Sequence, residues 1–170
     1  MNELEKILPD VLADAIAKAR VSGRGDIADF LALRASNDII RHASIKWLFD
    51  SMIEVASRAQ ADHRHLTIER EEPYTFRHQS AELTGSLLEL RLGVRCLRIE
   101  AGWTRLPKDG FIRGGGMAYA RFVHFGLPKA GVELSLRQTK DGASWSSGEG
   151  DALTVFGSAD IIHHFSMLLQ

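Results

Sequence analysis

The sequence is poor in cysteine and proline and has almost no net charge. Its 170 residues include one cysteine, Cys96, and four prolines, and the net charge is −1. A single cysteine excludes an internal disulfide framework and a zinc site built from cysteines. A net charge near zero gives no overall attraction to nucleic acid or to an anionic membrane surface. No apolar run approaches the roughly 20 residues that span a bilayer, so we expect no membrane segment.

The amino-terminal stretch MNELEKILPD lacks the basic start and the apolar core of a secretory signal. We therefore expect a cytoplasmic protein. Apolar residues make up 45% of the chain and charged residues 25%, which are the proportions of an ordinary folded protein. The length suits one domain with a substantial core, and we predict a single domain over residues 1–170.

Three helices are predicted within the first 60 residues. An amphipathic pattern covers residues 2–20, and Asp26 is placed to cap a short second helix. The polar run at residues 36–38 supplies caps for a third helix, which ends near residue 59. This third helix carries the clearest apolar stripe in the chain, formed by Ile45, Leu48, Phe49, Met52, Ile53 and Ala56.

Beyond about residue 62 the apolar pattern changes from helical to alternating. A weak strand pattern at residues 65–71 ends near Pro73, because proline cannot donate to a strand ladder. Residues 87–101 predict a hairpin that turns at Gly93 and Val94. In this register apolar residues meet apolar residues and an acid meets a base, in the pairs Leu90–Leu97, Leu88–Ile99 and Glu89–Arg98.

Further alternating segments follow at residues 117–125 and 132–137, near Trp145 and at residues 152–156. The segregated order of helices and strands is typical of an α+β fold. We expect three N-terminal helices packed on an antiparallel sheet of about five or six strands, with one C-terminal helix. The predicted parts are a helical layer at residues 1–60, the sheet at residues 62–157 and the last helix at residues 158–170.

Three consecutive glycines stand in the stretch RGGGMAYARF, which begins at Arg113. A phosphate-binding P-loop requires a lysine and a serine or threonine after its last glycine, and Met117 and Ala118 stand there instead. A dinucleotide fingerprint would require a small residue at Tyr119. Neither motif is present, so the glycines predict a bend or bulge at the start of a strand.

Basic residues gather between Arg91 and Arg121, where seven bases face only Glu100 and Asp109. Glycine N–H groups beside cationic side chains have the composition of an anion site, and a neighbouring tryptophan could stack on a ring. The candidate ligand-binding residues are therefore Trp103, Arg105, Lys108, Arg113, Gly114 and Gly115. The alternative interpretation is that the arginines pair with the acidic stretch at residues 141–160.

Other residue types that carry chemistry are scattered. His63 and His65 would share one face of a strand, and with His78 they could make a three-histidine metal site. Nothing in the sequence places His78 beside that pair, so we predict neither a metal nor a cofactor. Arginines close to Cys96 could lower the pKa of its thiol, but no catalytic partner can be assigned, and catalytic residues stay unassigned.

Because no enzymatic motif is complete, the sequence favours a non-catalytic binding or assembly module that has a protein partner or self-associates. The alternative is a small enzyme or sensor that acts on an anionic small molecule at the 103–116 loop. Nucleic-acid binding through residues 91–121 is a third hypothesis, which the net charge disfavours.

Overall fold

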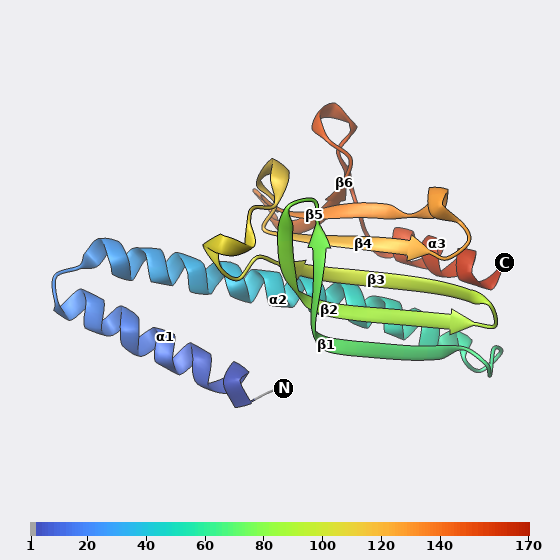
Figure 1. Ribbon diagram of the computed structural model, residues 1–170, viewed down its shortest axis with the longest axis horizontal. Coiled ribbons are helices and arrows are strands. Elements are labelled where there is room, and N and C mark those ends of the chain that lie inside the picture. Colours follow the sequence, from blue (N-terminus) through green and yellow to red (C-terminus); the bar gives the residue numbers. More distant parts are fainter. Residues whose placement is uncertain (1–2) are drawn as a thin grey trace. The chain divides into compact units, whose positions relative to one another are not determined.

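A computed structural model describes residues 3–170, with side chains from Asp10 onward. The chain divides into two compact units, one that ends at His42 and one that runs from Ala43 to Gln170. Figure 1 shows helices at both ends of the chain and an antiparallel sheet between them. The expected α+β class is therefore confirmed.

The first unit consists of α1, Glu3–Val21, and the first half of α2, Gly25–Ala59. Gly23 joins the two helices with a positive φ of 73°, a conformation that glycine adopts without strain. The Arg24 N–H donates to the Ala19 carbonyl at 2.9 Å, which closes the turn. Ala19 and Ala28 are both buried beside this turn, because their small side chains let the two helices approach.

The expectation of three N-terminal helices is wrong, because the predicted second and third helices are one continuous helix, α2. The polar run at residues 36–38 lies inside it. Asp38, an expected cap, instead accepts a hydrogen bond from Arg41 Nη1 at 2.7 Å, a pairing that suits residues three apart in a helix. No glycine or proline stands between residues 26 and 59. Helix propagation therefore costs less than a break would.

The sheet has seven strands, in the same order as in the sequence, and every neighbouring pair is antiparallel. The expected five or six strands were too few. The strands are β1 Thr67–His78, β2 Ala81–Leu92, β3 Arg95–Trp103, β4 Ala118–His124, β5 Val132–Thr139, β6 Gly142–Ser147 and β7 Thr154–Val155.

Strand β1 does not end at Pro73 as predicted. Its register against β2 shifts between Glu71 and Tyr74, so the proline lies in a bulge, and pairing then continues to His78. Proline lacks the N–H group that a central strand needs for pairing on both sides. Strand β1 lies at the edge of the sheet and pairs only with β2, so it tolerates the proline in a bulge. The hairpin prediction is confirmed, since Leu92 pairs with Arg95 and Glu89 with Arg98 around a turn at Gly93.

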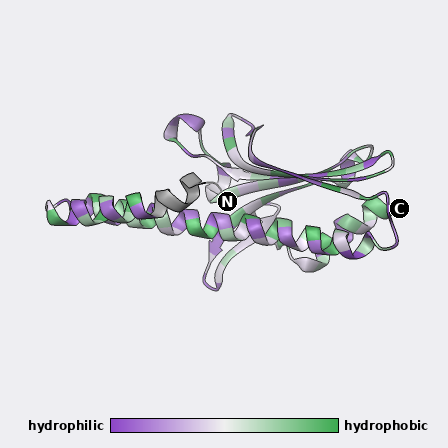
Figure 2. Cartoon of the chain, turned by 90° about the horizontal axis from the view of Figure 1, so that it is seen from below, coloured by the Kyte–Doolittle hydropathy of each residue, from purple (hydrophilic) through white to green (hydrophobic). Residues whose placement is uncertain are grey.

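The main core of the second unit lies on one face of the sheet. The C-terminal half of α2 and helix α3, Ser158–Leu169, cover this face, and both lie beneath the strands in Figure 2. The Trp145 indole N–H donates to the Ser44 carbonyl of α2 at 3.1 Å, and Phe122 packs against Phe156 and His164. The predicted stripe of α2 is buried here as expected, with Leu48, Phe49, Met52 and Ala56 fully enclosed.

A smaller apolar cluster forms on the opposite face. The outer halves of β1 and β2 curve away from the rest of the sheet in Figure 1. Their curvature brings Phe76, Ala81 and Leu83 against Tyr119 of β4. Gly85 makes this approach possible, because a Cβ atom there would lie 2.0 Å from the Ala101 carbonyl oxygen. The hairpin tip thus covers part of the face that the helices leave open.

Candidate functional site

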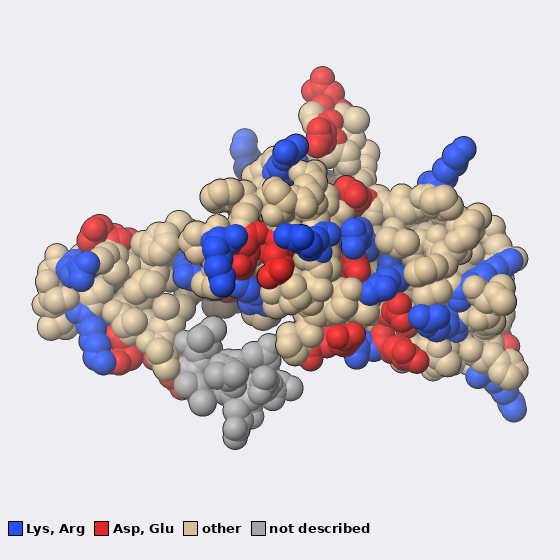
Figure 3. All heavy atoms as spheres, in the orientation of Figure 1, with Lys and Arg blue, Asp and Glu red and all other residues tan. Residues whose placement is uncertain are grey.

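The face of the sheet opposite the helices, hereafter the polar face, carries a row of charged side chains. Figure 3 shows basic and acidic residues interspersed across it. The alternation of side chains in β3 and β4 sends Arg98, Glu100 and Arg121 to this face, while Ile99 and Phe122 point to the core. The strands therefore carry charged side chains on the polar face and buried apolar side chains on the face toward the helices.

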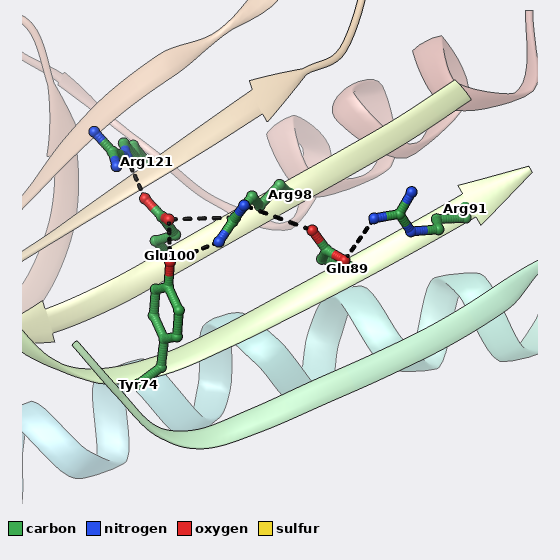
Figure 4. A network of polar contacts seen from close by, with 6 residues as sticks. All are labelled: Tyr74, Glu89, Arg91, Arg98, Glu100 and Arg121. Atoms are coloured by element: carbon green, nitrogen blue, oxygen red, sulfur yellow. Dashed lines mark hydrogen bonds and ion pairs between the residues drawn. The ribbon is translucent and has the colours of Figure 1, made fainter. Parts of the chain in front are cut away.

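Glu100 is the centre of this row and is only 3% exposed. Figure 4 shows its carboxylate between two arginines and a tyrosine. Arg121 donates to Oε2, and Arg98 Nε lies 3.2 Å from Oε1. Tyr74 donates its hydroxyl hydrogen to Oε1 at 3.1 Å and accepts one from Arg98 Nη2 at 2.6 Å. Burial, followed by the Glu100 charge, raises the pKa of Tyr74.

The network extends along β2 through Glu89, which contacts Arg91 at 2.9 Å and Arg98 at 3.8 Å. Arg91, Arg98 and Arg121 thus pair with acids of β2 and β3, rather than with the acidic stretch at residues 141–160. The guanidinium of Arg98 also lies 5.5 Å from the Tyr74 ring centroid. Because Tyr74 belongs to β1, the network fastens the outer edge of the sheet to its centre.

A cleft of about 200 Å³ opens beside this network. We call it the hairpin cleft, because the tip of the β1–β2 hairpin forms one wall. Its other walls come from the stretch before β4, from β4 to β6 and from the turn after β6. Its lining residues are His78, Gln79, Ile112, Arg113, Tyr119, Glu133, Ser135, Arg137, Ser146, Gly148 and Glu149.

Two buried polar atoms of the lining have no hydrogen-bond partner of normal geometry among the described residues: the Tyr119 hydroxyl and Arg137 Nε. Tyr119 is 3% exposed, so water cannot solvate it freely. Burial, followed by the charge of Glu133 and a hydrogen bond of poor geometry to its carboxylate, raises the pKa of Tyr119, which keeps the hydroxyl protonated and able to donate. Leaving such donors unmatched costs about 1–3 kcal/mol each, a cost that a bound acceptor would remove.

His78 forms the wall above Tyr119, with the two ring centroids 3.8 Å apart and the planes 23° from parallel. Burial lowers the pKa of His78, so the ring is neutral near pH 7. A neutral imidazole stacked on a phenol offers one donor and one acceptor without adding charge. The charge of the hairpin cleft therefore comes from its arginines and glutamates alone.

Comparison of the sequence with protein-family models, with curated proteins and with solved structures finds no match. The geometry of the polar face and of the hairpin cleft is therefore the basis for a functional hypothesis.

The predicted ligand-binding residues occupy different surroundings. Arg113 lines the hairpin cleft, and Arg137 Nη1 donates to the Gly114 carbonyl at 3.1 Å. Arg105 stacks on Trp103, with its guanidinium 3.5 Å from the ring centroid, and the alternation of β3 puts Trp103 on the helix side of the sheet. Lys108 and Gly115 are exposed. The binding role of all six residues stays a prediction.

The 103–116 loop is more ordered than its glycines suggest. It contains two short 3-10 turns, Pro107–Asp109 and Arg113–Gly115. The Asp109 carboxylate accepts hydrogen bonds from the backbone N–H groups of Arg105 at 3.1 Å and Leu106 at 2.8 Å. Some of the loop's backbone donors are therefore already used, and Gly114 and Gly115 adopt positive φ values that favour glycine.

Sequence reasoning missed Tyr119, Arg137, Ser135 and His78 as lining residues. The alternating pattern of residues 117–125 and 132–137 contained part of the signal, since it sends Tyr119, Ser135 and Arg137 to one face once the strands are paired. His78 could not be placed, because its position depends on the curvature at Gly85.

The remaining features considered in the sequence are the thiol of Cys96, a metal site and a membrane segment. Burial raises the pKa of the Cys96 thiol and outweighs the lowering effect of Arg91 and Arg98. Within the described part of the chain, no group of three or more histidine, cysteine, aspartate or glutamate residues is arranged to hold a metal ion. No helix among these residues is long and apolar enough to cross a bilayer.

Proposed function

We propose that this protein is a non-catalytic binding module that holds a small molecule with an anionic group in the hairpin cleft. The observation that carries the proposal is a pair of buried donors in one cleft: Arg137 Nε has no hydrogen-bond partner among the described residues, and the Tyr119 hydroxyl faces the Glu133 carboxylate without a hydrogen bond of normal geometry. An anionic oxygen atom could accept from both. Arg113, predicted from the sequence, adds a second cation at the same cleft.

The lining favours binding over catalysis. Nucleophilic catalysis requires a hydroxyl that is hydrogen-bonded to a base. Among the described side chains, neither Ser135 nor Ser146 hydrogen-bonds to His78, although all three line the hairpin cleft. The cleft is also smaller than the ~300–1,000 Å³ typical of sites for drug-sized ligands, so it suits a compact molecule.

Isothermal titration of the full chain at low salt tests this proposal, with inorganic phosphate, acetate, succinate and other small acids as probes. We expect saturable binding of at least one acid. Tyr119→Phe and Arg137→Gln should each weaken it roughly ten- to a hundredfold, the effect of losing one hydrogen bond to a charged group.

Tyr74→Phe is the matched control, because it makes the same chemical change on the same face at a hydroxyl that already has partners. It should lower stability and leave acid binding unchanged. Arg95→Gln, in an exposed turn, controls for the loss of one positive charge. Binding that survives both Tyr119→Phe and Arg137→Gln would contradict the proposal.

Self-association is a second candidate function, which one observation favours. The first unit leaves large apolar side chains in solvent, including Phe30 at 63%, Leu33 at 62% and Ile39 at 70% exposure. Phe30 and Leu33 are three residues apart and so lie next to each other on α2, and contiguous exposed apolar groups are typical of surfaces that associate.

Phe30→Glu with Leu33→Glu should convert any oligomer seen by analytical ultracentrifugation to monomer. Val94→Glu, at an exposed hairpin turn, should not, and a wild-type monomer at all concentrations would exclude this candidate.

A further inference from the structure

The charged residues of the hairpin cleft differ from those of the neighbouring network. In the network every acid contacts an arginine, as Glu89 contacts Arg91 and Arg98. In the hairpin cleft, Arg113, Glu133 and Glu149 form no ion pair within 4.0 Å with any described residue. Opposite charges therefore line one cleft without a direct ion pair, although Arg121, which is paired with Glu100, lies opposite Glu133 in the strand register. This arrangement leaves both signs available to a bound molecule.

The strand register separates these charges into two ends. Glu133, Ser135 and Arg137 alternate along β5 on the same side, so the Cα atoms of the acid and the base are roughly 13 Å apart. Gly114 lies beside Arg137, which places the neighbouring Arg113 at the basic end. Because β6 runs antiparallel to β5 and pairs Ser146 with Ser135, the turn after β6 that carries Glu149 lies toward Glu133.

The middle of the hairpin cleft is polar but uncharged. Tyr119 pairs with Ser135, and Ser135 pairs with Ser146, so three hydroxyl-bearing residues lie side by side across β4, β5 and β6. The Tyr119 hydroxyl, which makes no hydrogen bond of normal geometry, is among them. A ligand placed here would meet arginines at one end, hydroxyl groups in the middle and carboxylates at the other end.

From this arrangement we infer that the ligand is a small amino acid, whose carboxylate binds at the Arg113–Arg137 end and whose ammonium binds at the Glu133–Glu149 end. The inference rests on the proposed function, because it requires that the hairpin cleft binds a small molecule with an anionic group. It adds a requirement for a positive charge on the same molecule. A simple acid would satisfy the arginines and leave the two carboxylates without an ion pair of their own.

Isothermal titration of the full chain with the twenty L-amino acids and 4-aminobutyrate tests the inference. The best binder is then compared with its N-acetyl derivative, which lacks the ammonium charge, and with its amide, which lacks the carboxylate. We expect each derivative to bind at least tenfold more weakly than the free amino acid. Glu133→Gln should weaken binding of the free amino acid at least fivefold and should not weaken binding of the N-acetyl derivative, which loses only a repulsion.

Arg137→Gln should weaken binding of both the free amino acid and its N-acetyl derivative, since both keep the carboxylate. Glu69→Gln is the matched control, because Glu69 is exposed on β1 and lies outside the cleft lining. Glu149→Gln repeats the test at a second exposed acid, so the result does not depend on one variant.

Two negative results are distinguishable. If N-acetyl derivatives and simple acids bind as tightly as free amino acids, and Glu133→Gln and Glu149→Gln change nothing, the amino-acid inference is wrong while the proposed function stands. If neither simple acids nor amino acids bind, both are wrong. Weakening of the free amino acid alone by Glu133→Gln is the result that supports the inference.

Discussion

Glu100 illustrates how one buried charge organises a surface. Its carboxylate accepts from Tyr74 and Arg121 and contacts Arg98, so side chains of β1, β3 and β4 depend on it for neutralisation or anchoring. Removing such a charge from water is unfavourable unless every partner is in place. The presence of all three partners explains why Glu100 can lie at 3% exposure on an otherwise solvent-facing side of the sheet.

Glu100→Gln should therefore destabilise the protein markedly. The change leaves Arg98 and Arg121 without their shared counter-charge, and both guanidinium groups can recover only part of their hydration. We expect a loss of about 2–4 kcal/mol in the free energy of unfolding, measured by urea denaturation. Glu69→Gln, an exposed change of the same kind, should cost less than about 0.5 kcal/mol. Equal costs for the two variants would contradict a structural role for the network.

Phe49 tests the core that the sequence predicted for α2. It is fully buried, and the Arg70 guanidinium lies 5.4 Å from its ring centroid. Phe49→Ala should cost roughly 3–5 kcal/mol, because it removes apolar contacts and leaves a cavity. Trp47→Ala, two residues away on the same helix and 39% exposed, should cost much less. A loss of under 1 kcal/mol for Phe49→Ala would place this helix outside the core.

At the scale of elements, Gly85 and Gly102 form the cross-strand pair on which the curvature of β2 depends. A Cβ atom at Gly85 would lie 2.0 Å from the Ala101 carbonyl oxygen and 2.5 Å from the Gly102 Cα. Backbone atoms cannot yield as a flexible side chain can. The hairpin tip must therefore move away if Gly85 is replaced, and the wall of the hairpin cleft moves with it.

Gly85→Ala should lower stability by about 1–3 kcal/mol, the usual cost of overpacking, and should weaken any ligand binding in the hairpin cleft. Gly157→Ala is the control, since its Cβ would meet nothing within 4 Å and its φ is ordinary at −131°. Urea denaturation and titration of the same samples measure both effects. Unchanged stability in Gly85→Ala would mean that β2 does not need its close approach to β3.

Helix α3 is joined to the sheet by a buried histidine pair. His124 Nε2 of β4 lies 3.0 Å from His164 Nδ1 of α3, and one neutral ring donates to the other. Burial lowers the pKa of both rings, and that of His164 falls to about 4, although Asp160 nearby opposes the shift. Protonation of either ring would place a charge in the core, and protonation of both would set two N–H donors against each other.

Acid should therefore loosen the docking of α3. Because the folded-state pKa values are lowered, the unfolded chain binds more protons, and stability falls as the pH drops from about 6.5 toward about 4. We expect a loss of about 2 kcal/mol between pH 7.5 and pH 4.5 from His164 alone. His164→Gln should have a flatter pH profile in urea denaturation, while exposed His65→Gln should follow the wild type. Parallel profiles for His164→Gln and wild type would contradict this account.

Sequence patterns predicted helices and strands correctly where residues close together in the sequence determine the structure. The hairpin at Gly93 was predictable because its turn and cross-strand pairs lie within fifteen residues of each other. The break expected at residues 36–38 was wrong because polar residues that suit a cap also fit inside a helix, where Asp38 pairs with Arg41. The cap-forming residues alone could not distinguish a break from a continuous helix. The absence of glycine and proline from the same stretch favours the continuous helix.

For the whole molecule, the hairpin cleft was predictable only in part. Arg113 was chosen from local composition, because it stands beside glycines and other bases. Tyr119 and Arg137 come together through strand register, and His78 joins them through curvature at Gly85. These lining residues are 18 to 59 positions apart in the chain, and no short sequence pattern brings them together. The position of the site therefore depends on how the strands pair and curve, whereas the fold class could be predicted from the order of helical and alternating segments in the sequence.

The distribution of charge over the whole molecule also bears on nucleic-acid binding. Seven basic residues between positions 91 and 121 suggested a basic patch, but Arg91, Arg98 and Arg121 contact Glu89 or Glu100. Figure 3 shows acids among the bases across this face. A phosphate backbone approaching the polar face would therefore meet neutralised pairs rather than a continuous positive surface.

We accordingly expect weak binding to a labelled 20-nucleotide DNA in fluorescence anisotropy, with a Kd above roughly 10⁻⁴ M near physiological salt. The apparent affinity should change little between 50 and 200 mM salt, because few counterions are released. Glu89→Gln frees Arg91 and Arg98 from their shared partner, so it should raise both the affinity and the salt dependence. Glu69→Gln changes the net charge equally without releasing an arginine and serves as the control. A wild-type protein that binds DNA tightly with a steep salt dependence would show that the ion pairs open on contact, and the paired face would then be a nucleic-acid interface.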